Sequence, residues 1–201
     1  MTEVARVWFL TLCVLGMVGF VATVVSFWSR REDVERKIGP LPVPAPLIVF
    51  GLAALIVATR VGELSNGWAL LRGLGIALSV YALILIPMSA LTLRRLFVPG
   101  AAVLRDHVLV TSGPFRLVRH PLLSAVLAFW LGAALGTLNW LLLALWPLLL
   151  IAVHATTRHE EELLRGKFGE AYDAYAAKTG RLFPKLFGRD QSLEARTQQE
   201  G

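Results

Sequence analysis

Five long apolar stretches are the feature that most constrains the fold of this chain. They cover residues 7–28, 46–61, 68–93, 122–138 and 140–156. A helix needs about 20 mostly apolar residues to cross the hydrocarbon core of a bilayer, and each stretch has or approaches that length. Lipid cannot hydrogen-bond an exposed backbone, so apolar segments of this kind must be helical. The sequence therefore predicts an all-α, polytopic membrane protein with five transmembrane helices.

The composition excludes most soluble classes of protein. Hydrophobic residues make up 56% of the chain and charged residues only 17%, against about 25% charged in typical soluble domains. The formal charge of +6 can also suit a nucleic-acid partner, but the basic residues flank apolar segments, so we expect anionic lipid and no nucleic acid. The single cysteine, Cys13, lies inside the first apolar stretch, which excludes an internal disulfide and favours a buried small hydrophobe.

Lysine and arginine are distributed unevenly between the predicted connections. They collect in residues 30–37, in residues 94–119 and after Arg158, whereas the turns at 62–67 and 136–139 contain none. Because cytoplasmic loops carry the excess of these residues, five spans place the N-terminus outside and the C-terminus in the cytoplasm. We expect an integral protein of the bacterial inner (plasma) membrane.

The turn at 136–139 is so short that the fourth and fifth stretches should form a tight antiparallel hairpin. The hairpin would bring residues 105–121 and 154–188 together at one membrane face, where we expect the cofactor region. We predict one domain over residues 1–188. The polar residues 189–201 have no apolar face to bury, and we predict that they are disordered.

A helix that continues out of the fifth stretch would place four ionisable residues within about 60° of one another: His154, Arg158, Glu161 and Arg165. Ionisable groups at membrane depth normally face a protein interior or a wet cavity, so His154 is a site candidate. The alternative is a solvated helix with a Glu161–Arg165 pair. Arg119-His120-Pro121 also has two interpretations, as a site or as headgroup contacts at a helix start.

Several motifs occur in a fixed order along the second half of the chain. They are Leu109-Val110-Thr111-Ser112-Gly113-Pro114-Phe115, Arg119-His120-Pro121, a helical hairpin, Glu160-Glu161, Leu164, Phe168-Gly169, Tyr172, Tyr175 and Pro184. Together they resemble the superfamily of isoprenylcysteine carboxyl methyltransferases and phospholipid methyltransferases. The more N-terminal stretches match this superfamily only as apolar segments.

The resemblance implies methyl transfer from S-adenosylmethionine to a membrane-associated acceptor. It implies a cofactor site at Val110, Gly113, Phe115, His120, Pro121, Leu123, Glu160 and Glu161, and catalytic roles for Arg119, His120, Arg158 and Arg181. The residue types fit, because a carboxylate can hold the ammonium of the cofactor, a cation can meet its carboxylate and an aromatic ring can cover its adenine. Arg158 or Arg181 would orient an acidic acceptor, whereas an amine or thiol acceptor would use His120 as the base.

Other assignments remain open at this point. Leu123 stands where relatives carry a tyrosine, and residues 96–100 replace the signature of the prenylcysteine enzymes, so a lipid, a prenylated small molecule and a small amphiphile are all candidate acceptors. A nicotinamide-dependent membrane reductase is the first alternative, although the chain has no glycine-rich phosphate loop. A non-catalytic membrane protein is the second. The four histidines form no paired spacing on one helical face, so we expect no metal site.

Overall fold

The computed structural model describes residues 2–28, 34–37, 44–64, 68–93, 102–104 and 108–185. Each of the five apolar stretches forms a helix, and a short sixth helix follows. The helices are α1 (Thr2–Trp28), α2 (Pro44–Thr59), α3 (Ala69–Leu93), α4 (Pro121–Thr137), α5 (Trp140–Phe168) and α6 (Glu170–Lys178), and a 3-10 turn, η3 (Gly113–Arg116), precedes α4. The fifth helix continues to Phe168, beyond the apolar stretch that ends at residue 156.

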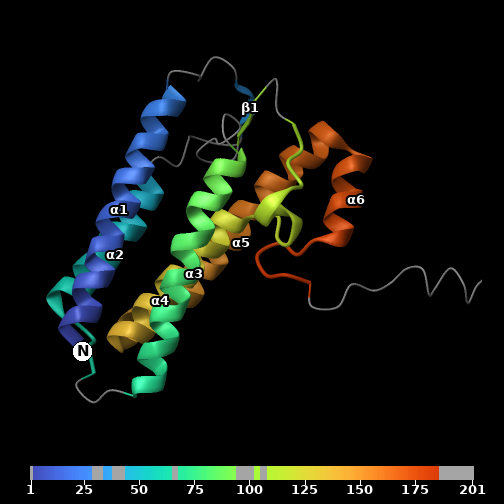
Figure 1. Cartoon of the computed structure of the whole chain (residues 1–201). Helices are drawn as coiled ribbons and strands as arrows, with labels where there is room; N and C mark the ends of the chain where they lie inside the picture. Colours follow the sequence, from blue (N-terminus) through green and yellow to red (C-terminus); the bar gives the residue numbers. More distant parts are fainter. Residues whose placement is uncertain are drawn as a thin grey trace, which may run out of the picture.

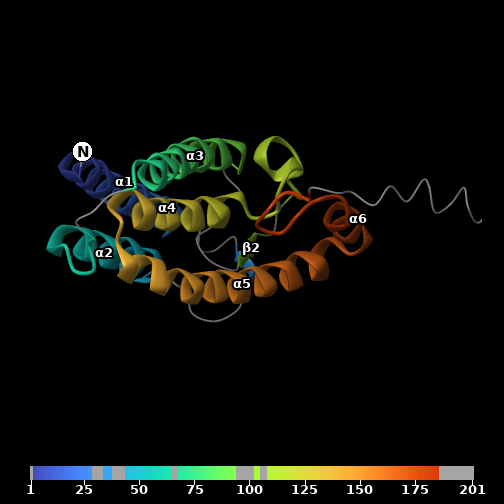
Figure 2. The same cartoon turned by 90° about the horizontal axis from the view of Figure 1, so that it is seen from below.

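The helices are arranged in layers around α4. Figure 2 shows α4 between α3 on one side and α5 on the other, with α1 and α2 at the end nearest the N-terminus. In Figure 1, α6 lies at the far end of α5, outside the bundle. Glycines allow α3 and α4 to approach closely, because a Cβ atom on Gly75 would overlap the backbone of Gly132 and Gly136. Small residues at helix contacts are the usual means of close packing in membranes.

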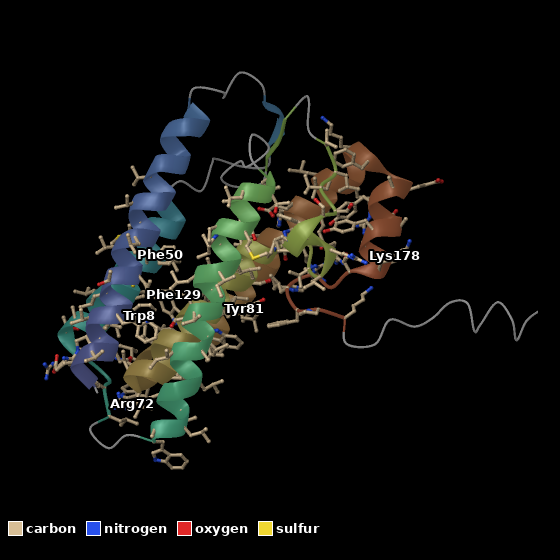
Figure 3. The ribbon with its side chains drawn as sticks, in the orientation of Figure 1. Trp8, Phe50, Arg72, Tyr81, Phe129 and Lys178 are labelled. Carbon is tan, nitrogen blue, oxygen red and sulfur yellow. The ribbon has the colours of Figure 1, made fainter. Side chains whose placement is uncertain are left out.

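The core of the bundle is aromatic and aliphatic. The ring of Phe129 lies 6.0 Å from that of Phe9 and 5.7 Å from that of Phe50, measured between centroids. Figure 3 shows Phe50 and Phe129 inside the bundle. Large apolar side chains also cover the outside, for example Leu70 on α3, which is 85% exposed. An apolar exterior of this kind is the surface that lipid, and not water, accommodates.

Two of the described helices, α3 and α5, are long and apolar enough to cross a membrane. Ile48–Thr59 of α2 and all of α4 form shorter apolar helices. The number of five transmembrane spans therefore stays a prediction. The tight hairpin is confirmed, because α4 ends at Thr137 and α5 begins at Trp140. Leu138 adopts a left-handed conformation at the turn, and the Asn139 side chain accepts hydrogen bonds from the first amides of α5.

The two turns that lack lysine and arginine lie side by side at one end of the bundle. Leu64 N–H donates to the carbonyl of Leu138, and the side-chain amide of Asn139 donates to the carbonyl of Val61. An ion pair between Arg6 and Glu63, with 2.6 Å between Nη2 and Oε2, fastens α1 to the same end. The distribution of lysine and arginine predicts that these two turns lie on the same side of the membrane, and the contacts confirm that they lie together.

Two short strands modify the prediction of an all-α fold. Strand β1 (Val34–Lys37) pairs antiparallel with β2 (Ala102–Leu104), with Val34 opposite Leu104 and Lys37 opposite Ala102. Extended connections need partners for their backbone groups, and each strand supplies them to the other. The ladder lies at the end of the bundle opposite the N-terminus (Figure 1), so it joins the two predicted basic tracts there. The predicted tail, residues 189–201, lies outside the described residues.

Candidate active site

The chain before α4 and the chain after α6 run side by side as a parallel β-bridge between Val118 and Gly180. Arg119 N–H donates to the carbonyl of Gly180 at 2.9 Å, and His120 N–H donates to the carbonyl of Arg181 at 3.1 Å. The hydroxyl of Ser124, one turn into α4, donates to the carbonyl of Leu182 at 2.6 Å. These bonds fix the Arg119-His120-Pro121 motif against a segment about 60 residues later.

Glu161 of α5 lies at the centre of the site, and its side chain is 4% exposed. Its Oε1 accepts from Arg119 Nε at 2.8 Å, and its Oε2 accepts from Arg181 Nη2 at 2.6 Å. Burial alone would raise the pKa of this carboxyl, but the adjacent His120 ring and the hydrogen bonds from Arg181 and Arg119 outweigh burial and hold the pKa well below its usual range. Glu161 is therefore a buried anion.

The alternative of a solvated Glu161–Arg165 pair is wrong. Arg165 Nε donates to Asp173 Oδ1 at 2.6 Å, on the exposed side of α6. Residues four apart on a helix can pair, but the two arginines that reach Glu161 from other segments are better placed. The carboxylate is consequently shielded from solvent by α4, α6 and the chain after it.

His120 lies between both glutamates of the pair. Its Nδ1 is 3.0 Å from Glu160 Oε2, and its Nε2 is 3.4 Å from Glu161 Oε1. The second contact is too long and poorly aligned to count as a hydrogen bond, so Nε2 is buried without a hydrogen-bond partner among the described residues. Burial disfavours the charged imidazole, but the glutamates outweigh this effect and raise the pKa of His120 above its ordinary value.

Two tyrosines of α6 pack against the segment that carries the site. The hydroxyl of Tyr175 donates to the carbonyl of Phe115 at 2.6 Å, and burial raises the pKa of Tyr175 to about 12. Tyr172 is completely buried and meets Tyr175 edge to face, with 6.1 Å between ring centroids. Arg119 also donates to the carbonyls of Ala176 and Thr179. These contacts tie α6 to the start of α4.

A groove of about 690 Å³ opens beside this cluster. One wall belongs to α5 and the other to the chain after α6. The lining residues are Arg119, Leu150, Ile151, His154, Gly180, Arg181, Leu182, Phe183 and Lys185. Arg181 joins the groove to the buried cluster, because its Nη2 binds Glu161 while its Nη1 lies 3.3 Å from His154 Nε2.

The structure brings together five of the residues that the sequence singles out: Arg119, His120, Glu160, Glu161 and Arg181. Pro121 is buried as the first residue of α4, and Leu123 packs on a small apolar cluster of Leu127, Val153 and Leu182. Phe115 is buried in η3 and bonds Tyr175 through its carbonyl.

Three other predicted residues lie away from the ion-pair cluster. Val110 precedes η3 and Gly113 is its first residue, with a φ of +59° at a point where a Cβ atom would press on Thr92. Arg158 is exposed on α5, and it makes no ion pair within the described ranges. Arg181 takes the position beside Glu161, and a catalytic role for Arg158 stays a prediction.

Sequence reasoning missed the backbone pairing of residues 179–182 with the start of α4. Thr179 and Gly180 carry no chemistry of their own, so the only hint of this contact was that the resemblance places Arg181 in the same site as Arg119 and His120. Sequence reasoning also missed that the hydroxyl of Tyr172 is buried with no hydrogen-bond partner among the residues that the structure describes. The signal available in the sequence was that Tyr172 and Tyr175 follow Gly169 on an otherwise polar helix. Large aromatic residues at such positions indicate a buried face.

Comparison with known proteins assigns the chain to a family. The family described as phospholipid methyltransferase matches residues 68–171, just over half of the chain. No curated protein sequence matches significantly. A solved structure of a eukaryotic intramembrane Ras methyltransferase, isoprenylcysteine carboxyl methyltransferase, aligns with a TM-score of 0.49 and 22% identity, covering 73% of this chain. The alignment spans 51% of that protein, about half its length. The resemblance inferred from the motifs is confirmed, and the chain belongs to the phospholipid methyltransferase family.

Proposed function

We propose that this protein transfers a methyl group from S-adenosylmethionine to a lipid or lipophilic small molecule in the membrane. The observation that carries the proposal is the cluster of Arg119, His120, Glu160, Glu161 and Arg181 beside an apolar groove. Membership of the phospholipid methyltransferase family supports methyl transfer at a membrane. The identity of the cofactor, the class of acceptor and the roles of the individual residues go beyond family membership and form the content of the proposal.

The residues present fit the chemistry of the cofactor. Its ammonium needs an anion, and Glu160 is the more accessible carboxylate, with a side chain that is 25% exposed against 4% for Glu161. Its carboxylate needs donors, and the buried Nε2 of His120 has no hydrogen-bond partner in the described part of the chain. The groove volume of about 690 Å³ falls within the roughly 300–1,000 Å³ usual for ligand sites. The buried ring of Phe115 and the side chain of Leu123 supply apolar surface nearby.

The protein's own contribution would be positioning and exclusion of water. When bound, S-adenosylmethionine supplies an activated methyl group on a positively charged sulfur. Glu161 holds Arg119 and Arg181 in fixed orientations through bonds of 2.8 and 2.6 Å, so the groups that orient the reactants cost no reorganisation at the moment of reaction. No nucleophilic side chain is required, because correct alignment of acceptor and methyl group contributes most of the rate.

The site lies at the end of the bundle where the basic tracts meet, opposite the N-terminal end of α1 (Figure 1). Because positively charged loops stay on the cytoplasmic side, we propose that the site faces the cytoplasm and that the N-terminus lies outside. The acceptor would then enter sideways from the inner leaflet of the membrane.

Calorimetry on the full-length protein in nanodiscs tests the cofactor directly. We expect S-adenosylmethionine to bind the wild type and to bind Glu160→Gln roughly ten- to a hundredfold more weakly, since a hydrogen bond to a charged group contributes about 1.5–3 kcal/mol. Glu162→Gln is the matched control, because Glu162 is the exposed neighbour on α5. Binding of a nicotinamide cofactor with no binding of S-adenosylmethionine would overturn the proposal in favour of a reductase.

A second measurement identifies the reaction. Methyl-labelled S-adenosylmethionine is incubated with the nanodisc protein and a lipid extract, and label in the organic phase is counted. We expect labelled product with the wild type and little with His120→Ala. Equal counts for the wild type and a protein-free control would contradict methyl transfer even if the cofactor binds.

A further inference from the structure

We propose that Ser124 is a positioning residue of this site. Its hydroxyl holds the chain that follows α6, residues 179–185 (the strap), against α4, and it thereby keeps Arg181 paired with Glu161. The inference rests on the proposed function and adds a residue that the sequence motifs do not include. Ser124 touches neither the cofactor nor the acceptor in this role, because it acts through the strap.

The hydroxyl of Ser124 bonds a segment far away in the sequence. Ser124 is 6% exposed, and its Oγ lies 2.6 Å from the carbonyl oxygen of Leu182 and 3.0 Å from that of His120. A serine inside a helix ordinarily bonds the carbonyl four residues earlier, which here is that of His120. A hydroxyl has only one hydrogen to donate, and the shorter distance assigns this hydrogen to Leu182.

Leu182 is the residue by which the strap is packed into the fold. Its side chain is 6% exposed and forms an apolar cluster with Leu127 of α4 and Val153 of α5. Its carbonyl accepts no backbone N–H in the described part of the chain, so Ser124 satisfies it. A buried carbonyl without a partner is costly. Loss of the hydroxyl therefore favours a state in which the strap moves away from α4 and its carbonyl reaches water.

The bond to Leu182 fixes the backbone on one side of Arg181. On the other side, Arg119 N–H donates to the carbonyl of Gly180, and His120 N–H donates to the carbonyl of Arg181 itself. The arginine is thus held between two attachments to the start of α4, and from there its Nη2 reaches Glu161 at 2.6 Å. Release of one attachment gives a long side chain more freedom, which opposes its fixed pairing with Glu161.

The chain offers a second buried serine as a matched control. Ser89 of α3 is completely buried, and its hydroxyl donates to the carbonyl of Leu85 in the same helix at 2.7 Å. Alanine at either position removes one buried hydroxyl from a helix, but of the two substitutions only Ser124→Ala removes a bond between separate segments. The difference between the two variants therefore isolates the contact with the strap.

Hydrogen exchange of the full-length protein in nanodiscs, read by mass spectrometry, tests this contact without any substrate. The amides of Arg119 and His120 report on the strap, because they donate to its carbonyls. We expect them to exchange about tenfold faster in Ser124→Ala, the effect of losing one hydrogen bond from a local structure, and at the wild-type rate in Ser89→Ala. Unchanged exchange in Ser124→Ala, or an equal increase in both variants, would overturn the proposal.

A double-mutant cycle tests whether Ser124 acts through Arg181. The folding equilibrium constant is measured in mixed micelles for the wild type, Ser124→Ala, Arg181→Ala and the double variant. If the hydroxyl keeps Arg181 on Glu161, both substitutions remove the same contact, so the loss in the double variant should be at least threefold smaller than the product of the single losses. A loss within twofold of that product would contradict action through Arg181.

Rates of methyl transfer connect the contact to the proposed reaction. With methyl-labelled S-adenosylmethionine and a lipid extract, we expect Ser124→Ala to transfer label about three- to tenfold more slowly than the wild type, and Ser89→Ala to retain the wild-type rate. A wild-type rate in Ser124→Ala would overturn the positioning role. Absence of label transfer by the wild type, with the expected exchange and coupling, would instead contradict the proposed function alone.

Discussion

Glu161 shows how one carboxylate can organise a site built from three separate segments. It receives Arg119 from the chain before α4 and Arg181 from the chain after α6, and it lies 3.4 Å from His120. A buried ion pair is weak evidence for stability by itself, because desolvation opposes the Coulomb attraction. Removing only the carboxylate is destabilising, because Arg119 and Arg181 then lose the counter-charge with which both pair.

The first residue-level prediction follows from this asymmetry. Glu161→Gln should lower the free energy of unfolding by about 3 kcal/mol or more, the usual cost of breaking a buried pair from one side. The measurement is reversible unfolding in mixed micelles. Glu162→Gln, on the exposed face of α5, should change stability by less than about 0.5 kcal/mol. Equal effects of the two substitutions would show that the charge cluster contributes nothing specific.

The second residue-level prediction concerns pH. The pKa of His120 is raised above 6.5 in the folded protein, so its stabilising contribution is complete below pH 6.5 and is lost as the pH rises through the folded pKa. The pKa of Glu161 is lowered below 4.5, so its contribution is complete above pH 4.5 and is lost as the pH falls. The cluster should be most stabilising between these values.

Unfolding free energies measured from pH 5 to pH 9 check this expectation. The wild type should lose stability as the pH rises above 6.5, and His120→Asn should show a flatter profile over the same range. A wild-type profile that rises with pH in this range would contradict the assignment of a stabilised imidazolium.

At the level of the elements, α4 holds the bundle together because it contacts helices on both of its faces (Figure 2). Its contact with α3 depends on glycine. Gly75 faces Gly132 and Gly136 so closely that an added methyl group has no room, whereas Gly73, two residues earlier, has open space around its Cα. The two positions offer a matched pair on one helix.

We therefore predict opposite outcomes for the same substitution. Gly75→Ala should destabilise the protein by about 1–3 kcal/mol, because overpacking forces α3 and α4 apart. Gly73→Ala should be neutral or slightly stabilising, because alanine favours the helix over glycine by up to about 1 kcal/mol. Thermal unfolding of both variants in detergent provides the measurement. A stability of Gly75→Ala equal to that of the wild type would show that the helices do not pack this closely.

The helices and the hairpin were predictable from sequence, and much of the site was not. Apolar runs and the short turn before Trp140 predict α4 and α5, and the Glu160-Glu161 pair follows from the motif order. The partners of Glu161 did not follow, because Arg165 has the correct helical spacing and Arg181 does not. The position of Arg181 depends on a backbone pairing at Gly180 that carries no pattern in sequence. The β1–β2 ladder was missed for the same reason, since three- and four-residue strands carry little signal.

At the level of the whole molecule, the two ends of the bundle differ in the connections they carry: the turns without lysine or arginine lie at one end, and the basic tracts lie at the other. The turns at Leu64 and Leu138 meet at one end, and the site occupies the other, with Lys178 on α6 farther still from the bundle core (Figure 3). The lysine and arginine distribution predicts that the site end faces the cytoplasm. An integral protein whose reactive groups gather at one end can present a single face to its water-soluble reactant.

Site-specific labelling tests this orientation. In a Cys13→Ser background, Leu64→Cys and Glu162→Cys each introduce an exposed thiol at opposite ends of the bundle. An impermeant maleimide added to intact cells should label position 64 and not position 162, and inverted vesicles should give the reverse. Labelling of both positions from the same side would contradict the predicted topology.

The parallel bridge between Val118 and Gly180 also fixes when the site can form during synthesis. A ribosome adds about 5–20 residues per second, and segments made first fold first. The start of α4 must therefore wait for some 60 further residues, including the whole of α5 and α6, before its hydrogen-bond partners leave the ribosome. We expect a chain truncated before residue 179 to lack the hydrogen bonds that hold Arg119 and His120 in place. The cluster around Glu161 therefore assembles only after residues 179–182 have left the ribosome and paired with the start of α4.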